Sequence, residues 1–346
     1  MDILYLNGKL KERITSMKKK SMLIIVLIIT FAVSIFTFNK NHELVDKESL
    51  AVFIDDVKAD SFPSKGTVTF LKADCDNNAT IEWDKDSWGL FASNLTKKTK
   101  CNLYFKNLES INDLVKSDKT NIASDDPDGN IRYIGASPSN YVYFNCSDYD
   151  NQTSDTCEIW RIIGLFKNIN KEDGTKEDLV KIIKDDSIGS VAWDTNNSNI
   201  WANASLKSSF NSGIYYNKTL KNDTTRNMIE SVVWELGSTT SFIGDSDGNP
   251  SSLYSAERNS NNWTGKIALM YPSDYGYAVG GSDRETCLSK SLYNWSSMPK
   301  CYNNNYLYKA NIYQWTLMTN NLTGSYVYAV KSNGGFNYGN AYSTDD

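Results

Sequence analysis

The sequence predicts an α+β protein that begins with a single transmembrane helix and continues into a disulfide-bridged extracellular part. Three observations support this prediction. An uncharged apolar run occupies positions 22–38, and all six cysteines follow it. The remaining sequence mixes short alternating runs, typical of strands, with segments of helical periodicity. With 346 residues, 40% of them hydrophobic, the chain is long enough to bury a sizeable core, so global disorder is not expected.

Composition argues against several classes of function. The formal net charge of −5 disfavours a nucleic-acid binder, because such a protein needs a basic face that displaces counterions. The single histidine, His42, lies in a charged stretch near the amino end, so a histidine-containing triad or a multi-histidine metal site is not expected. The sequence contains no G-x-S-x-G elbow, glycine-rich phosphate loop or zinc motif.

The apolar run at 22–38 is predicted to be a membrane signal-anchor. As a helix it would span roughly 26 Å, close to the lower limit for crossing a bilayer. Basic residues are concentrated before the run, so the positive-inside rule places residues 1–21 in the cytoplasm and the carboxyl-terminal domain outside the cell. A cleaved signal peptide is the alternative, and it is less favoured because no small-x-small cleavage site follows the run.

The six cysteines are predicted to form three structural disulfides between nearest neighbours. The expected bonds are Cys75–Cys101, Cys146–Cys157 and Cys287–Cys301. Order along the chain does not exclude the other connectivities. A zinc or redox site is the alternative, but no C-x-x-C spacing occurs. Disulfides persist in an oxidising compartment, which agrees with the predicted export.

Changes in composition divide the chain after the anchor. Residues 39–65 are polar and are expected to form a partly helical stalk. Residues 66–106 contain alternating runs that predict a small β-module, braced by its own bridge because so short a module buries little core. Residues 107–126 are expected to be a linker with a short helix at Leu108–Ser117. Residues 127–346 then form one α+β domain.

The large domain is expected to contain both strands and two helices. Strands are predicted where β-branched and aromatic residues cluster, at 141–145, 158–166, 179–183, 266–272, 314–318 and 326–332. The helices are predicted at 204–221 and 225–237 from apolar residues at helical spacing, the second of them followed by Gly237 at a C′ position. This order of elements resembles a C-type-lectin-like arrangement.

Several strings also resemble a family of uncharacterised membrane-anchored surface proteins of Gram-positive bacteria. They are RYIGASPSNYVYFN (132–145), WRIIGLF (160–166), W-x-x-ASL (201–206), GKIALMYPSDYGYA (265–278) and QWTLM (314–318). The match runs through most of 66–346, and Asp274-Tyr275-Gly276-Tyr277 is its most specific part. The resemblance implies an exported surface protein with a lectin-like domain and implies no activity.

The resemblance carries two further expectations. Family members continue beyond residues 340–342 into a terminal strand, so this chain is expected to be a fragment or to lack its last core strand, with an unpaired edge there. The lectin-like scaffold also hosts copper-dependent formylglycine-generating enzymes. Those enzymes need a reactive cysteine pair, whereas the cysteines of this chain are assigned to bridges.

Two acidic turns, at 126–130 and 245–249, offer clustered oxygen ligands of the kind that calcium prefers. The candidate calcium ligands are Asp126, Asp128, Asp245, Asp247 and Asn249. Neither turn matches an EF-hand, because the glycine comes too early and no Glu follows at the twelfth position. Asx-rich turns without an ion are the commoner explanation, and no other cofactor is expected.

The aromatic residues suggest a sugar-binding surface, because a flat ring pairs with the apolar face of a pyranose. The candidates, which lie near predicted loops, are Trp193, Trp201, Trp263 and Trp295. The alternative is that they pack the core, as is expected of Trp160 and Trp234.

Glu257, Arg258 and Asp274 complete the candidate ligand-binding residues, since they belong to the region of resemblance. A contact between Arg and a carboxylate that organises a loop would explain them equally well. Because 41 acidic residues make no Asp/Glu pair specific, no catalytic residue is assigned and enzymatic activity is not expected.

The sequence therefore predicts a single-pass surface protein that binds glycan or another surface protein and no nucleic acid. Two alternatives stay open, a cell-wall-processing hydrolase that uses Asp/Glu carboxylates and a structural envelope protein without a ligand. Two partly buried carboxylates in an open cleft would favour the hydrolase. The structural alternative predicts neither a cleft nor an aromatic platform.

Overall fold

The computed structural model describes residues 2–6, 50–63, 68–84, 88–94, 99–107, 110–149, 151–239, 248–258 and 261–344. Of these residues 37% lie in strands and 21% in helices, so the protein is mainly β and the predicted α+β class is wrong. The predicted anchor at 22–38 lies outside the described residues. No helix within the described ranges is long and apolar enough to cross a membrane.

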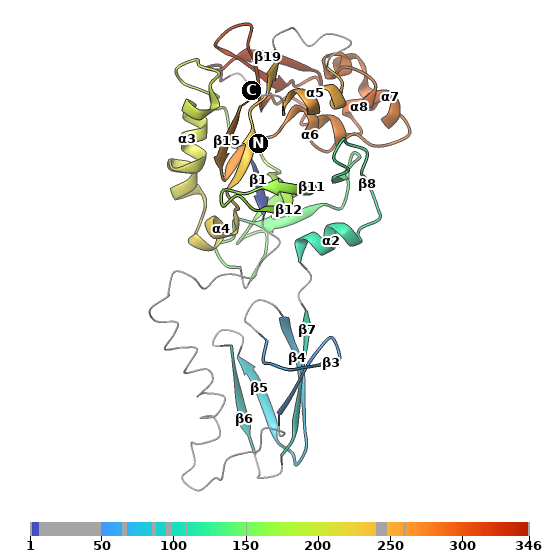
Figure 1. Ribbon diagram of the computed structural model, residues 1–346, viewed down its shortest axis with the longest axis vertical. Coiled ribbons are helices and arrows are strands. Elements are labelled where there is room, and N and C mark those ends of the chain that lie inside the picture. The colour runs from blue at the N-terminus through green and yellow to red at the C-terminus, as the bar shows by residue number, and fades with distance from the viewer. Residues whose placement is uncertain are drawn as a thin grey trace. The chain divides into compact units, whose positions relative to one another are not determined.

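The chain divides into two compact units (Figure 1). We call Lys9–Ser110 the small unit, and Met1–Gly8 together with Ile111–Asp346 the large unit. The boundary near residue 110 lies close to the predicted end of the β-module at 106. The predicted stalk at 39–65 and the module at 66–106 both fall in the small unit. Most of the predicted linker at 107–126 falls in the large unit.

The small unit contains a four-stranded sheet of order β3-β2-β7-β4 and a separate two-stranded hairpin. The strands are β2 (Leu50–Ile54), β3 (Val57–Ala59), β4 (Val68–Cys75), β5 (Thr80–Asp84), β6 (Gly89–Ser93) and β7 (Cys101–Asn107). β2 lies inside the sheet, so the described part of the predicted stalk is β structure rather than helix. The reason is that its continuous apolar run pairs with β7, and Val52 is buried with Leu103 and Phe105 of that strand.

The large unit contains a seven-stranded sheet in which β1 (Asp2–Leu6) lies between β12 and β16. The other strands are β8 (Ile122–Ala123), β9 (Ile131–Tyr133), β10 (Tyr141–Phe144), β11 (Glu158–Asn170), β12 (Lys176–Lys184) and β16 (Ile267–Leu269). β1 is antiparallel to both neighbours, with Leu4 opposite Ile182 and Ile267. Residues 2–6, which the prediction assigns to a tail at 1–21, are therefore a strand of the large sheet.

Two smaller sheets complete the strands of the large unit. One pairs β13 (Val232–Glu235) with β15 (Asn262–Gly265). The other has the order β14-β17-β18-β19 and contains β14 (Ser238–Thr239), β17 (Gln314–Asn320), β18 (Tyr326–Val330) and β19 (Phe336–Asn340). The predicted strands at 141–145, 158–166, 179–183, 314–318 and 326–332 correspond to β10, β11, β12, β17 and β18.

The helices of the large unit are short. They are α2 (Ile111–Ser117), η2 (Trp201–Asn203), α3 (Ser205–Asn211), η3 (Tyr215–Thr219), α4 (Asp223–Met228), α5 (Pro250–Ala256), α6 (Pro272–Tyr277), α7 (Arg284–Leu288), η4 (Leu292–Ser297) and α8 (Pro299–Tyr302). Figure 1 shows α3 and α4 on one side of the unit and α5 to α8 on the other.

The two predicted long helices are replaced by short helices and a strand. The segment predicted as one helix at 225–237 ends its helix at Met228, and Val232–Glu235 is strand β13, because Val232, Val233 and Trp234 favour extended backbone and pair with β15. The helix predicted at 204–221 is interrupted between α3 and the π-helical segment η3. Apolar spacing alone did not distinguish these outcomes.

The helix predicted for the linker belongs to the large unit. α2 packs against β11 and β12, and Val115 is fully buried in the large core. That core also contains Trp160 and Trp234, as expected. Gly164 in β11 is required by close approach, since a Cβ there would lie 2.1 Å from the carbonyl oxygen of Ile131.

The prediction that the cysteines form disulfides is confirmed. The bonds are Cys75–Cys101, Cys146–Cys157 and Cys287–Cys301. The first joins facing residues of β4 and β7 in the small unit. The other two lie in the large unit, and all six sulfurs are paired.

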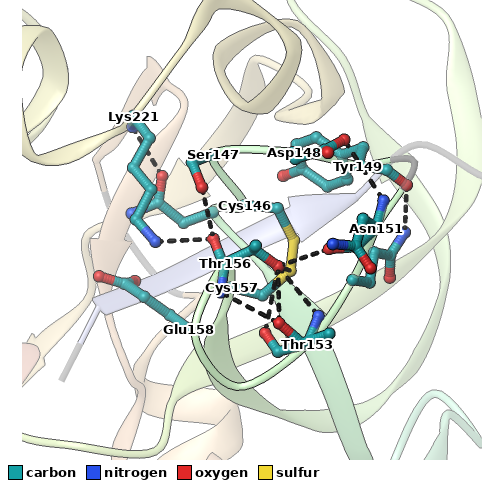
Figure 2. Close-up of a disulfide and its surroundings, with 12 residues drawn as sticks. Cys146, Ser147, Asp148, Tyr149, Asn151, Thr153, Thr156, Cys157, Glu158 and Lys221 are labelled. Carbon is teal, nitrogen blue, oxygen red and sulfur yellow. Dashed lines mark hydrogen bonds between the residues drawn. A yellow bond between two sulfur atoms is a disulfide. The ribbon is translucent and has the colours of Figure 1, made fainter.

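Figure 2 shows how the Cys146–Cys157 bond closes the loop between β10 and β11. Within this loop the Ser147 amide donates to the carbonyl oxygen of Thr156 at 2.8 Å. The loop is also held from outside, because the Lys221 ammonium donates to the same Thr156 carbonyl at 2.9 Å. The bridge therefore fixes a loop that is already anchored to the segment before α4.

Replacing Cys146 and Cys157 together by Ser is expected to lower the free energy of unfolding by about 2 kcal/mol. The value lies at the lower end of the usual range because the bond spans only 11 residues and closes a short loop in the unfolded chain. Urea unfolding of the oxidised protein measures the loss. Ser147→Ala, which removes one exposed hydrogen bond in the same loop, is the control and is expected to change stability by less than about 0.5 kcal/mol. Equal losses in both variants would contradict the prediction.

Candidate functional site

A pocket of about 130 Å³ lies between two loops of the large unit. One wall is the segment 185–191, which follows the last residue of β12. The other is the segment 309–315, which leads into β17. Leu206 of α3 and Leu269 of β16, both buried, line its inner end. The pocket therefore has an apolar interior that is built by the core of the unit.

Two aromatic residues, Tyr313 and Trp315, line the pocket. The Trp315 indole N–H donates to the carbonyl oxygen of Val191 at 3.1 Å, which fixes the ring across the two walls. The same ring packs near Gly339 of β19. Tyr313 keeps 39% of its surface exposed. The pocket therefore combines one fixed, half-buried ring with one that is accessible.

Gln314 lies between these two aromatic residues and is almost completely buried, with 2% of its surface exposed. Its Nε2 donates to the carbonyl oxygen of Leu307 at 3.1 Å. Because a carbonyl only accepts, this contact assigns the other side-chain atom as the oxygen. That Oε1 is buried and has no hydrogen-bond partner among the residues that the structure describes. Leaving such an acceptor unpaired costs about 1–3 kcal/mol, and its lack of accessible surface keeps it out of reach of a molecule in the pocket.

The rim of the pocket carries charges of both signs. Lys309 donates to Asp185 at 2.8 Å, and Arg161 lies 3.8 Å from the same carboxylate. Arg161 is itself held by Asn140 at 2.6 Å and by the ring of Tyr141. Asp185 is thus neutralised and serves to position the Lys309 ammonium. Asp186 adds an exposed carboxylate to the rim.

Two of the acidic residues singled out from the sequence, Asp126 and Asp274, meet elsewhere in the large unit, in a buried charged network. Asp274 accepts from Lys181 Nζ at 2.6 Å and from Arg132 Nη1 at 3.0 Å. The Arg132 Nε donates to Asp126 at 2.6 Å. None of these four side chains is more than 2% exposed. The two carboxylates and two cations therefore neutralise one another inside the protein.

The pKa of Asp274 is lowered in this network. Burial opposes the charged form, but the Lys181 ammonium and the Arg132 guanidinium outweigh it. Burial also opposes ionisation of Asp126, where Arg132 and Asn130 keep the pKa below its usual value. The Tyr271 amide adds a hydrogen bond of 2.9 Å to Asp274 at the start of α6. Both carboxylates are charged and fully engaged by protein groups.

The candidate calcium sites do not assemble in the described part of the protein. Asp126 is committed to Arg132 and Asn130, and Asp128 accepts a short hydrogen bond from the Tyr254 hydroxyl. Asn249 caps α5 by accepting from the Ser252 amide. Asp245 and Asp247 lie outside the described residues. Within the described ranges no group of three or more His, Cys, Asp or Glu residues is placed to hold a metal ion.

Glu257 and Arg258 form a second buried contact beside this network. The Glu257 carboxylate accepts from the Ser273 amide at 2.8 Å, from the Ser273 hydroxyl at 2.6 Å and from Arg258 at 3.2 Å. Burial raises the pKa of Glu257 to about 7 despite these donors. Arg258 stacks on the ring of Tyr254. These contacts join α5 to α6, as expected of an Arg–carboxylate contact that organises the fold.

The tryptophans singled out from the sequence do not form a binding platform. Trp193, Trp201 and Trp295 are buried in the core of the large unit. Trp193 packs on Trp201 with ring centroids 5.2 Å apart, and the half-buried Trp263 meets Trp201 edge-on. Trp193, Trp201 and Trp295 therefore pack in the core, as the alternative interpretation expects. Trp263 packs against the same core from its edge.

Sequence reasoning missed the residues that do line the pocket. It identified QWTLM as a strand but did not consider Tyr313, Gln314 and Trp315 as a site. The sequence did contain a signal for this site. It is the string Tyr313-Gln314-Trp315, in which two aromatic residues flank a polar one at the start of a predicted strand. Asp185 and Lys309 are 124 residues apart in sequence, and only the fold brings them together.

The fold and the pocket define a mainly β, disulfide-bonded protein with a small, aromatic-walled cavity in its large unit. Comparisons with models of known protein families, with curated proteins and with solved structures find no match to this chain. The resemblance to Gram-positive surface proteins thus stays a prediction.

Proposed function

We propose that this chain is an exported binding protein whose large unit recognises carbohydrate through the pocket between segments 185–191 and 309–315. The observation that carries the proposal is the pair of aromatic side chains, Tyr313 and Trp315, that line the pocket beside polar groups of its rim. The C–H face of a sugar packs against aromatic rings, and its hydroxyl groups pair with polar side chains such as Lys309 and Asp186. Pockets that combine apolar and aromatic side chains with a few polar groups are typical ligand sites.

The three disulfides support export, because such bonds persist in an oxidising compartment. The pairing of β1 with β12 and β16 is consistent with both ends of the large unit lying on the same side of a membrane. The proposal therefore places both units outside the cytoplasm and assigns no cytoplasmic tail.

The size and charge of the pocket favour a small polar ligand over a protein partner. A specific protein interface buries about 800 Å² on each side, far more surface than a hollow of about 130 Å³ can supply. Lys309 is balanced by Asp185, and Asp186 adds a single exposed carboxylate. Such a rim suits hydroxyl groups better than a strongly charged ligand.

Tyr313→Ala is expected to weaken glycan binding about tenfold, which corresponds to about 1.4 kcal/mol, because it removes the accessible aromatic wall. A glycan array on oxidised protein identifies a ligand, and titration by intrinsic fluorescence, to which the nearby Trp315 contributes, gives the affinities. Tyr342→Ala is the matched control, since Tyr342 is 58% exposed and does not line the pocket.

Three outcomes would count against the proposal. Folded, oxidised protein that binds no glycan on the array would contradict carbohydrate recognition. Equal affinities for Tyr313→Ala and Tyr342→Ala would place the ligand elsewhere. Release of new reducing ends from a bound glycan would favour the hydrolase alternative over a binding protein.

A further inference from the structure

We infer that the binding site extends from the pocket onto the outer side of strands β10 and β11, so that the ligand is an oligosaccharide chain and not a single sugar. This inference rests on the proposed function and narrows its substrate class. It is carried by three exposed side chains, Tyr141, Tyr143 and Ile159, which we call the tyrosine face.

The tyrosine face lies on the solvent side of the β10–β11 pair. Val142 and Phe144 of β10 pack against the core of the large unit. Tyr141 and Tyr143 alternate with them, so they point outwards and keep 55% and 39% of their surface exposed. Ile159 of β11 is paired with Tyr143 and is 42% exposed. A cluster of large exposed apolar and aromatic side chains is typical of a binding surface.

The tyrosine face adjoins the rim of the pocket. The backbone amide of Asp185, a rim residue, donates to the carbonyl oxygen of Ile159 at 3.2 Å. Arg161 lies 3.8 Å from the Asp185 carboxylate and donates from Nη1 to the Tyr141 hydroxyl at 2.8 Å. A ligand that leaves the pocket past Asp185 therefore reaches the tyrosine face.

The ring of Tyr141 is held in place before any ligand binds. Its centroid lies 3.9 Å from the guanidinium carbon of Arg161. Arg161 is itself buried, and its Nε donates to the Asn140 side chain at 2.6 Å. The ring thus rests on a fixed side chain and is still more than half exposed. Because it is already ordered, it loses little side-chain entropy when a ligand packs on it.

The properties of the tyrosine face favour an oligosaccharide over a protein. Its three side chains are uncharged, and three partly exposed side chains supply far less than the roughly 800 Å² that a protein partner covers on each side. Tyr141 and Tyr143 are two residues apart on one strand, a spacing of about 7 Å. They can therefore pack against successive sugar rings of a chain whose end lies in the pocket against Tyr313.

Isothermal titration of the full oxidised chain with short and long sugars tests this inference. The probes are three neutral pairs: cellobiose and cellohexaose, maltose and maltohexaose, laminaribiose and laminarihexaose. In at least one pair the hexasaccharide is expected to bind about tenfold more tightly than the disaccharide, because only the longer chain covers both the pocket and the tyrosine face.

Tyr143→Ala tests whether the tyrosine face causes this gain. It is expected to weaken hexasaccharide binding about fivefold and to leave disaccharide binding unchanged, whereas Tyr313→Ala weakens both. Ile159→Gln, at the paired position on β11, is expected to act in the same direction as Tyr143→Ala and carries the test if that variant does not fold.

Tyr293→Ala is the matched control. Tyr293 is also 39% exposed but lies in η4, and it is expected to change neither affinity. Circular dichroism and a urea transition establish that each variant is folded.

The outcomes separate the inference from the proposed function. Equal affinities for the short and long sugars of every pair that binds would overturn the extended site and leave carbohydrate binding intact. A folded Tyr143→Ala variant that weakens both lengths equally, or neither, would also overturn it. Absence of binding to all the probes would overturn the inference, and absence of binding to every arrayed glycan as well would overturn the proposed function.

Discussion

Replacing Asp274 by Asn is expected to lower the free energy of unfolding of the large unit by about 3–5 kcal/mol. The substitution keeps the size of the side chain and its acceptor for the Tyr271 amide. It removes the negative charge that faces the Lys181 ammonium at 2.6 Å and the Arg132 guanidinium at 3.0 Å. Both cations would then be buried with Asp126 as their remaining anion. Urea unfolding at neutral pH measures the loss.

Asp223→Asn is the matched control for this substitution. Asp223 also accepts from an arginine, Arg226, at 2.9 Å, but its own side chain is 85% exposed. Solvent screens such a pair, so a loss below about 1 kcal/mol is expected. Similar losses for Asp223→Asn and Asp274→Asn would show that the buried network is not an important source of stability.

The titration of Glu257 is expected to make the protein about 3 kcal/mol less stable at pH 8 than at pH 4.5. In the unfolded chain this carboxyl has its usual pKa near 4.5, and in the fold burial raises the pKa to about 7. Between these values the folded protein binds a proton that the unfolded chain has released. The free energy of unfolding therefore falls as the pH rises from 4.5 to 7 and is level above that range.

Other buried carboxylates also affect how the free energy of unfolding depends on pH. Asp274 and Asp126 have lowered pKa values, so their contribution is lost only below about pH 4. Burial also raises the pKa of Glu235, which adds to the effect of Glu257 in the same direction.

The variant Glu257→Gln tests whether Glu257 causes the fall in the free energy of unfolding with rising pH. Glutamine does not titrate, so urea unfolding of this variant between pH 4.5 and 8 is expected to show a dependence reduced by about 3 kcal/mol. Glu285→Gln, on α7 and exposed, is the control and is expected to keep the wild-type slope. A wild-type stability that rises with pH over this range would contradict the prediction.

Local features of the sequence were sufficient for part of the fold. Strands β10, β11, β12, β17 and β18 were predicted from clusters of β-branched and aromatic residues, because these residues favour extended backbone wherever they pack. Apolar spacing failed at Val232–Glu235, where it predicted a helix although Val232, Val233 and Trp234 favour extended backbone and pair with β15. The short apolar stretch at Leu50–Ile54 was likewise resolved by its parallel partner β7.

The candidate site was less predictable than the fold. Asp126 was singled out as a candidate calcium ligand, and Glu257 and Asp274 as candidate ligand-binding residues. All three are buried, beside Arg132, Lys181 and Ser273. The pocket depends on loops that follow β12 and precede β17, and on Gln314, whose unpaired oxygen is visible only when its surroundings are known. The type of a residue alone does not show whether its side chain is buried or which groups it contacts.

The sequence by itself was enough to predict the covalent framework, because cysteines that are neighbours in a chain need little loop closure to meet. It also determined which segments are apolar enough to build a core. Only the tertiary structure decided the mainly β class, the placement of Asp2–Leu6 inside the large sheet, and which charged and aromatic side chains face the pocket. Those properties depend on contacts between distant segments, and local sequence patterns carry no information about which distant segment will be the partner.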